Sequence, residues 1–273
     1  MSYKVICSDL DGTLLNSNSE LSPENSLAIE KIVDMGYLFV PATGRTLAEL
    51  PPEVRNHKSI RYFIYSNGSG IYDKLSDKYY ETPVERKSIA KIIEIIKDYD
   101  LLHLLHIDGS VRLDNYGYKR AAEFKVWPPY MKLFNFIPDE LRVDDFIEYL
   151  KTLDKMEMLV TFFRRDNDVE AECRARLSEI PELHVTASAD GNIEIVNKDA
   201  NKGNALRRFS NLIGIGLSEF ITAGDSPNDI EMLSVAGLSF AVSGAKDTVK
   251  NAATKVICSN EEHIAKYILE NII

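Results

Sequence analysis

The sequence predicts an α/β fold, a doubly wound parallel sheet with an α+β domain inserted into it. Two observations lead to this fold class. Short apolar runs alternate with helical patterns towards both ends of the 273-residue chain, as they do in α/β sheets. The middle of the chain breaks this alternation, because its strand-like runs outnumber its helical ones.

The first strand is expected at residues 4–9, a short apolar run that ends in acidic residues and therefore suits a buried parallel strand. A helix is expected next, because Ser22 can cap it and Pro23 suits its first position. Apolar residues at helical spacing continue this helix, and Gly36 provides a stop.

Two more strands are expected at residues 37–42 and 62–66. The segment 41–45, at the end of the earlier strand, is expected to open a helix. Asn67-Gly68, after the later strand, is typical of a tight turn. The resulting β-α-β-α-β succession is the pattern of a doubly wound sheet.

The alternation resumes downstream of residue 200. The patterns there predict strands at 219–223, 238–242 and 256–259 and helices at 202–212, 229–236 and 261–269. We therefore assign residues 1–82 and 191–273 to one α/β core.

Residues 83–190 are assigned to the inserted α+β domain. Isoleucines at positions 89, 92, 93 and 96 have the i, i+3, i+4, i+7 spacing of one helix face. The other patterns of the middle of the chain indicate a helix at 143–153 and strands at 101–107, 110–113, 158–163, 184–187 and 192–196.

Composition excludes several classes of protein. Hydrophobic residues make up 45% and charged residues 27%, which gives a globular chain enough apolar material for a core. A net charge of −10 argues against nucleic-acid binding, which usually needs a basic face. No run approaches the ~18 apolar residues of a membrane span. Three scattered cysteines without a CxxC pair, and an N-terminus without a signal-peptide pattern, predict a reduced, cytoplasmic protein without a zinc site.

Two acidic motifs follow predicted strands of the core. Asp9 and Asp11 lie directly after the first strand, and Asp225 and Asp229 lie after the strand at 219–223. Ligands bind at the carboxyl ends of strands in open α/β sheets, so we expect the two motifs to meet. Oxygen ligands from two strand ends suit Mg²⁺. Solvated acids in polar loops are the alternative, and the presence of both motifs favours a metal site.

Two weaker motifs suit phosphate binding. Thr43 and Gly44 follow the strand at 37–42, where a hydroxyl and a backbone N–H can receive a phosphate at a helix N-terminus. Lys202 begins the helix at 202–212, where its ammonium can hold phosphate and keep a carboxylate ionised. A common Thr-Gly turn and a solvated lysine are the alternatives for each motif taken alone.

Together these motifs resemble the four ordered motifs of the haloacid dehalogenase-like superfamily. They read Asp-Leu-Asp-Gly-Thr at 9–13, Ala-Thr-Gly-Arg at 42–45, Lys-Gly at 202–203 and Gly-Asp-Ser-Pro-Asn-Asp at 224–229. The insertion between the second and third motifs, with Ser66-Asn67-Gly68 before it, is similar to that of the Cof-type sugar phosphatases. The resemblance implies a Rossmann-like core with a type II, subclass B cap domain. Residues 243–246, Ser-Gly-Ala-Lys, depart from the Met-Gly-Asn-Ala-like stretch that is usual in this family.

The resemblance also implies a role for each acid. Asp9 would be the nucleophile that becomes an aspartyl phosphate. Asp11 would protonate the leaving alkoxide and then deprotonate water, and burial beside Asp9 is expected to keep a proton on it. Mg²⁺ would be held by Asp9, the Asp11 backbone carbonyl and Asp225, with Asp229 in support.

The phosphoryl group would be bound by Thr43, Gly44, Lys202 and Asn228. The resemblance therefore predicts a Mg²⁺-dependent phosphatase for a small phosphorylated metabolite, such as a sugar phosphate, acting as a monomer or weak homodimer. A phosphomutase is the alternative enzyme, because related capped folds also move phosphoryl groups between hydroxyls. A catalytically silent binding or regulatory protein is the alternative from another class.

Two features of the middle segment have simpler interpretations. His103 and His106 point to opposite faces of a strand, so we expect packed histidines and not a shared metal ion. Trp127, Phe134 and Phe136 could line a substrate mouth or an interface, and a satellite core is the alternative.

Overall fold

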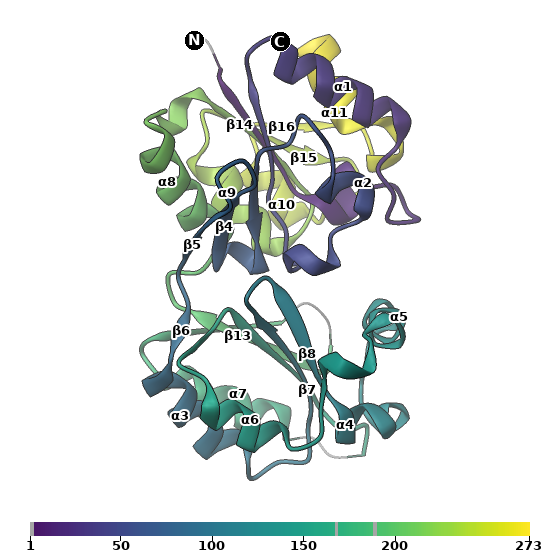
Figure 1. The fold of residues 1–273 in the computed structure, drawn as a ribbon. Coiled ribbons are helices and arrows are strands. Elements are labelled where there is room, and N and C mark those ends of the chain that lie inside the picture. The colour runs from purple at the N-terminus through teal and green to yellow at the C-terminus, as the bar shows by residue number, and fades with distance from the viewer. Residues whose placement is uncertain (1–2, 167–168, 188–189) are drawn as a thin grey trace. The chain divides into compact units, whose positions relative to one another are not determined.

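The computed structural model describes residues 3–166, 169–187 and 190–273. The chain divides into two compact units, and Figure 1 shows the elements of each. Unit 1 contains the chain up to Tyr80 and again from Asn201 to the C-terminus, and unit 2 contains Glu81–Ala200. Each unit has its own sheet and its own apolar clusters.

The sheet of unit 1 is parallel, with strand order β16-β15-β14-β1-β2. Its strands are β1 (Val5–Ser8), β2 (Leu38–Pro41), β14 (Phe220–Gly224), β15 (Leu238–Val242) and β16 (Lys255–Ile257). β1 and β14 are buried along their whole length, as expected of central parallel strands. Because β14, β1 and β2 are neighbours, the residues that follow them meet at one edge of the sheet.

Helices cover both faces of this sheet (Figure 1). α1 (Pro23–Asp34) and α11 (Ile264–Asn271) share one apolar cluster with Ile6 of β1. α8 (Lys202–Ile213) and α9 (Ile230–Val235) share another with Val5 and Cys7 of the same strand. Alternate residues of β1 thus face opposite helical layers. The predicted α/β fold class with a doubly wound parallel sheet is confirmed.

The helix expected to begin at residues 41–45 does not form there. The chain bends after Ala42, and its first helical turn is the three-residue η2 (Leu47–Glu49), followed by the four-residue α2 (Pro52–Arg55). Leu50 is extended because it precedes Pro51, and a residue before proline avoids the helical region. The turn at Thr43 therefore does not lie at a helix N-terminus.

β3 (Tyr62–Tyr65) lies beside β2, to which a parallel bridge joins it between Ile64 and Ala42. It then turns back into the antiparallel strands β4 (Gly70–Asp73) and β5 (Lys78–Glu81). The sequence patterns did not predict β4 and β5. The remaining helix of unit 1, α10 (Asp247–Ala252), follows the 243–246 segment and contacts the turn Pro227–Asp229.

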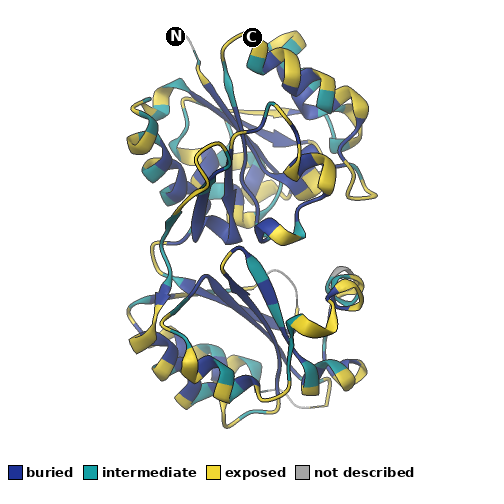
Figure 2. Cartoon of the chain, in the orientation of Figure 1, coloured by how far each residue is buried: buried dark blue, intermediate teal, exposed yellow. Residues whose placement is uncertain are grey.

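Unit 2 has a mixed six-stranded sheet of order β12-β13-β11-β7-β8-β9. Its strands are β7 (Leu102–Ile107), β8 (Ser110–Asp114), β9 (Arg142–Val143), β11 (Met158–Phe162), β12 (Leu183–Thr186) and β13 (Asn192–Asn197). Its helices are α3 (Arg86–Ile96), α4 (Asn115–Lys119), α5 (Pro128–Phe136), α6 (Phe146–Thr152) and α7 (Glu170–Ser178). β7 and β11 are buried along their whole length, β9 and β12 are only partly buried, and the outer faces of the helices are exposed (Figure 2). The isoleucine stripe of α3 packs in a cluster with α6 and α7, which fits its predicted role as a buried helix face.

The limits of unit 2 differ from the predicted insertion, 83–190, at both ends. Its C-terminal limit is Ala200 because β13 pairs antiparallel with β11 and β12 and so belongs to its sheet. At the other end, β6 (Val84–Glu85) pairs with β10 (Lys155–Met156). The Asn197 side chain donates a hydrogen bond to the Pro83 carbonyl at 2.7 Å. The entry and exit segments of unit 2 are therefore bonded to each other.

The histidines and aromatic residues of unit 2 have mixed environments. His103 and His106 are both buried in β7, as expected, and the His103 ring stacks on Phe146 at 5.0 Å. Phe134 is buried in a satellite cluster, whereas Trp127 and the end of α5 at Phe136 are exposed. Across the described ranges, no helix is long and apolar enough to cross a membrane.

Candidate active site

A buried lysine joins two carboxylates at the edge of the unit 1 sheet. Lys202 Nζ donates to Asp9 Oδ1 at 2.6 Å and to Asp229 Oδ1 at 2.7 Å. The Lys202 side chain is 0% exposed and that of Asp9 is 8% exposed. Burial alone would lower the pKa of Lys202, but Asp229 and Asp9 outweigh burial and raise it. Lys202 is therefore a charged group within the site, and the alternative of a solvated lysine is wrong.

The start of α8 fixes the position of Lys202. Asn201 caps the helix by accepting the Asn204 N–H at 2.7 Å. Gly203 allows α8 to approach α9 closely, because a Cβ at this position would lie 2.7 Å from Cβ of Glu231. The capped first turn thus places the lysine against the end of β1.

The loop after β14 is held together by its own carboxylates. Asp229 Oδ2 accepts the N–H groups of Asp225 and Ser226, both at 3.0 Å, while its other oxygen binds the lysine. The Asp225 carboxylate accepts hydrogen bonds from the hydroxyls of Thr13 and Ser226, each at 3.0 Å. The motifs after β1 and β14 therefore meet, as expected from their places at neighbouring strand ends.

Gly12 is required at this junction for two reasons. Its φ is +78°, a region that favours glycine. A Cβ at this position would also lie 2.6 Å from Asp225 Oδ2, far inside contact distance. The glycine in the first motif thus lets the turn after β1 lie directly against the second acidic motif.

The acids gathered here can hold a cation. Oxygens of Asp9, Asp225 and Asp229 lie within 4.8 Å of one another. Burial raises the pKa of Asp9 well above its ordinary value, and repulsion from the other two carboxylates adds to this against the attraction of Lys202. Burial and Asp229 likewise raise the pKa of Asp225. Three carboxylates face one ammonium, so a cation with a preference for oxygen ligands would balance the cluster.

Asp11 does not have the expected environment. Its side chain is 48% exposed, and its two oxygens accept hydrogen bonds from Arg45 Nε at 2.8 Å and Nη2 at 2.5 Å. Arg45 also donates to the Glu49 carbonyl at 3.1 Å. The expectation that Asp11 is buried beside Asp9 is wrong, because the chain leaves the sheet after Asp9 and the turn Leu10–Leu14 has Asp11 on its exposed side.

Thr43, Gly44 and Asn228 are linked through a residue to which the sequence analysis gave no role. Asn228 Nδ2 donates to Asn67 Oδ1 at 2.9 Å, and the Asn67 N–H donates to the Thr43 carbonyl at 3.0 Å. A Cβ on Gly44 would lie 3.1 Å from the same Asn67 oxygen. The Thr43 hydroxyl accepts the Arg45 N–H at 3.1 Å. Asn67 thus connects the turn after β2 to the loop after β14.

Four side chains of this site were not assigned roles from the sequence: Thr13, Arg45, Asn67 and Ser226. Thr13, Arg45 and Ser226 lie inside the four sequence motifs. Their position next to residues with assigned roles could therefore have identified them as site residues. Asn67 stands in a turn, and its link to Asn228, 161 positions away in sequence, depends on how β3 and β14 are placed. Sequence patterns do not contain that information.

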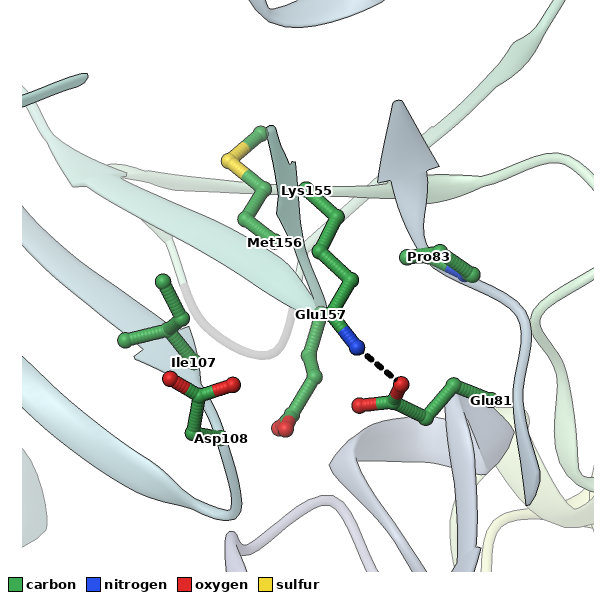
Figure 3. A pocket seen from close by; sticks show the side chains of 7 residues that line it. All are labelled: Glu81, Pro83, Ile107, Asp108, Lys155, Met156 and Glu157. Atoms are coloured by element: carbon green, nitrogen blue, oxygen red, sulfur yellow. Dashed lines mark hydrogen bonds and ion pairs between the residues drawn. The ribbon is translucent and has the colours of Figure 1, made fainter. Parts of the chain in front are cut away.

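Unit 2 has a shallow pocket of its own (Figure 3). It is lined by Glu81, Pro83, Ile107, Asp108, Lys155, Met156 and Glu157. Figure 3 shows the Lys155 side chain reaching the Glu81 carboxylate, with which it forms an ion pair. Glu157 is buried and accepts the Gly109 N–H at 2.7 Å. Because Lys155, Glu81 and Glu157 are already bonded to other groups of unit 2, we assign no ligand to the pocket.

Comparison with known proteins identifies the family. The family model described as haloacid dehalogenase-like hydrolase matches residues 6–268. The 5-amino-6-(5-phospho-D-ribitylamino)uracil phosphatase YcsE of Bacillus subtilis is 30% identical, over 97% of this chain and 94% of that protein. The chain belongs to the haloacid dehalogenase-like hydrolases. Its similarity to pyridoxal phosphate phosphatase YbhA of Escherichia coli, 24% identical, covers the full length of both chains.

A solved structure also resembles this haloacid dehalogenase-like hydrolase over its whole length. TM0651 from Thermotoga maritima has a TM-score of 0.82 and 28% identity, covering 99% of this chain and 98% of that one. The predicted family and enzyme class, a phosphatase of this superfamily, are therefore confirmed.

Proposed function

We propose that this haloacid dehalogenase-like hydrolase is a Mg²⁺-dependent phosphatase that acts through an aspartyl phosphate on Asp9. The observation that carries the proposal is the bond of buried Lys202 to Asp9 and Asp229, beside Asp225. A nucleophilic carboxylate must approach an anionic phosphate. At an effective dielectric near 20, two unit charges 4 Å apart repel by about 4 kcal/mol, so positive charge beside Asp9 is needed.

In the first step, an Asp9 oxygen attacks phosphorus and the bond from phosphorus to the alkoxide oxygen breaks. Asp11 gives its proton to that oxygen, so the alcohol leaves neutral. In the second step, water attacks phosphorus and gives a proton to Asp11, while the bond from phosphorus to Asp9 breaks. Both oxygens of Asp11 accept hydrogen bonds from Arg45, and a protonated carboxyl group keeps acceptor capacity, so Arg45 can hold Asp11 in place while Asp11 carries the proton.

Mg²⁺ would be held by the Asp9 and Asp225 carboxylates and the Asp11 backbone carbonyl, while Asp229 holds the loop. When bound, it supplies positive charge that offsets the repulsion between nucleophile and phosphate. The all-oxygen donor set and the raised pKa of Asp9, caused by burial and then by neighbouring carboxylates, support this assignment.

The phosphoryl oxygens would be bound by the Thr43 hydroxyl, the Gly44 N–H, Lys202 and the Asn228 amide. These groups contact only the part that all phosphate esters share. We therefore propose that residues of unit 2 select the leaving group, and that the substrate is a small metabolite such as a sugar phosphate. The name of the Bacillus relative, which specifies a 5-phospho-D-ribityl group, supports a polyhydroxylated chain.

The test is phosphate release from a panel of phosphorylated metabolites, with Mg²⁺ or with excess chelator. Wild-type protein should release phosphate only with Mg²⁺, and Asp9→Asn should lose at least about a thousandfold in kcat, as expected for loss of a covalent nucleophile. Asp77→Asn, an exposed acid on the β4–β5 turn, serves as the matched control. Full activity in chelator, or in Asp9→Asn, would contradict the proposal.

A further inference from the structure

The turn after β3 has an unusual backbone. Ser66, Asn67 and Gly68 all have positive φ, at 47°, 53° and 90°. This region is costly for residues other than glycine, although asparagine tolerates it better than most. Two successive non-glycine residues are held there only where surrounding contacts determine the conformation. All three residues are buried, so the contacts that hold them come from the protein itself.

The turn is bonded to the two loops that carry proposed phosphate ligands. The N–H groups of Ser66 and Asn67 donate to the carbonyls of Arg45 and Thr43, at 2.9 and 3.0 Å. The Asn67 side-chain oxygen accepts Asn228 Nδ2 at 2.9 Å. Both the turn after β2 and the loop after β14 are therefore fixed to Asn67.

The same turn also lies against the start of α8. A Cβ on Gly68 would be 2.4 Å from the Asn201 carbonyl oxygen, and the Gly68 carbonyl accepts Arg208 Nη2 at 2.7 Å. Asn201 is the cap of the helix that begins with Lys202. Residues 66–68 thus contact all three segments that carry the proposed phosphate ligands.

The bond from Asn67 determines which end of the Asn228 amide can face an anion. An amide presents two N–H donors on nitrogen and an acceptor on oxygen. With one Nδ2 hydrogen given to Asn67, the other remains on the same nitrogen to bind a phosphoryl oxygen. If the Asn228 amide were reversed, its oxygen would face the Asn67 oxygen. The atom in the place of Nδ2 would then be an acceptor, which cannot donate to a phosphoryl oxygen.

We propose that Asn67 is a positioning residue for the phosphoryl group: it orients Asn228 and holds the backbone at Gly44. This inference rests on the proposed function, because it assigns phosphate binding to those two residues. Asn67 affects phosphate binding through its neighbours. Its contribution to the binding free energy is therefore an interaction energy with Asn228, which a double-mutant cycle measures.

The experiment compares wild type, Asn67→Gly, Asn228→Ala and the double variant, with Mg²⁺ present. Glycine adopts the backbone angle of Asn67 without strain, so the substitution removes the amide and keeps the turn. The readouts are the Kd of inorganic phosphate by calorimetry, the KM of a hydrolysed ester, and Tm. Asp77→Gly is the matched control, because Asp77 also has φ of 53° and accepts a 3.0 Å hydrogen bond, from Tyr72.

Asn67→Gly should raise both the Kd of phosphate and KM at least about tenfold, the effect of losing one hydrogen bond to a charged group. Its Tm should change no more than that of Asp77→Gly, which should keep wild-type affinity. The double variant should bind phosphate about as weakly as Asn228→Ala alone. Wild-type affinity in Asn67→Gly, or additive losses in the double variant, would overturn the inference while leaving the phosphatase intact. If wild type neither binds phosphate nor hydrolyses any ester, the proposed function is wrong and this inference with it.

Discussion

At the scale of single residues, the site contains more negative charge than its lysine balances. The folded-state pKa of Asp9 is raised by burial first and by neighbouring carboxylates second. The stabilising contribution of its protonated form is fully present below the unfolded pKa, near 3.8, and is lost as the pH rises through the folded pKa. Without a metal ion, ionised Asp9 therefore destabilises the fold at neutral pH.

This charge balance makes a prediction about stability. In chelator, Asp9→Asn should have a higher Tm than wild type near pH 8, by a few °C, and the difference should shrink as the pH falls towards 4. Asparagine cannot ionise, so it removes the cost that wild type bears at high pH. Thermal unfolding across this pH range, with and without Mg²⁺, is the measurement. A Tm difference that is constant with pH would show that Asp9 does not carry the raised pKa.

Arg45 is the second residue with a testable role. Its two bonds hold Asp11 in one orientation, and Asp11 is needed most when the leaving group is a poor one. Arg45→Met should therefore lower kcat for alkyl phosphates about 10²-fold or more, and for an aryl phosphate with an acidic phenol much less. The ratio of the two rates is the measurement. Arg61→Met is the control, because Arg61 forms a comparable two-bond pair with Asp73 elsewhere in unit 1. An equal loss on both substrates would assign Arg45 a purely structural role.

At the scale of elements, the sequence predicted the strands of the parallel sheet and the helices α1, α8, α9 and α11 to within a few residues, but it did not predict α10 between β15 and β16. Short, nearly continuous apolar runs suit buried parallel strands, which is why β1 and β14 were found. The hairpin β4–β5 was missed because neither strand alternates regularly: two apolar residues follow each other at Ile71-Tyr72 in β4 and at Tyr79-Tyr80 in β5. The helix expected after β2 was wrong because the first helical turn begins only after the extended Thr46, and the extended Leu50 before Pro51 ends it after three residues.

The site was predicted to a similar extent. Carboxylates at the ends of neighbouring strands had to meet, so Asp9 and Asp225 were found from their places in the chain. The exposure of Asp11 could not be predicted, since a turn of five residues decides the direction of its side chain. Nor could the bond between Asn67 and Asn228, which depends on tertiary placement alone.

The turn after β1 makes a prediction at this scale. Gly12→Ala should weaken Mg²⁺ binding at least about tenfold, because its methyl group would displace the Asp225 carboxylate as well as strain the backbone. Gly214→Ala is the matched control: φ there is +69°, and nothing lies within 4 Å of an added Cβ. Both variants should lose stability to strain, and only Gly12→Ala should lose metal affinity by titration calorimetry. Equal affinities in the two variants would contradict the role given to this contact.

At the scale of the whole molecule, all the proposed ligands of the metal and phosphate lie in unit 1. Replacing residues 81–200 with a short Gly/Ser linker should therefore leave slow hydrolysis of an aryl phosphate and abolish preferences among sugar phosphates. Asn197 and Pro83, each within a few residues of a cut point, are bonded to each other, which is why a short linker is chosen. The measurement is the ranking of kcat/KM across the substrate panel, with circular dichroism to verify folding. A folded variant that keeps the wild-type ranking would place specificity in unit 1.

The paired ends of unit 2 also bear on the order in which the chain folds. Unit 1 is discontinuous: β1 must pair with β14 across residues 9–219, and 120 of these 211 residues belong to unit 2. Because the cost of loop closure grows as (3/2)RT ln n, closing this loop costs about 0.7 kcal/mol less when unit 2 has already folded and about 91 residues of the loop remain. Unit 2 is continuous in sequence, and its folding would bring Pro83 and Asn197 together and shorten that loop. Early folding of unit 2 would then speed formation of the sheet that carries Asp9 and Asp225.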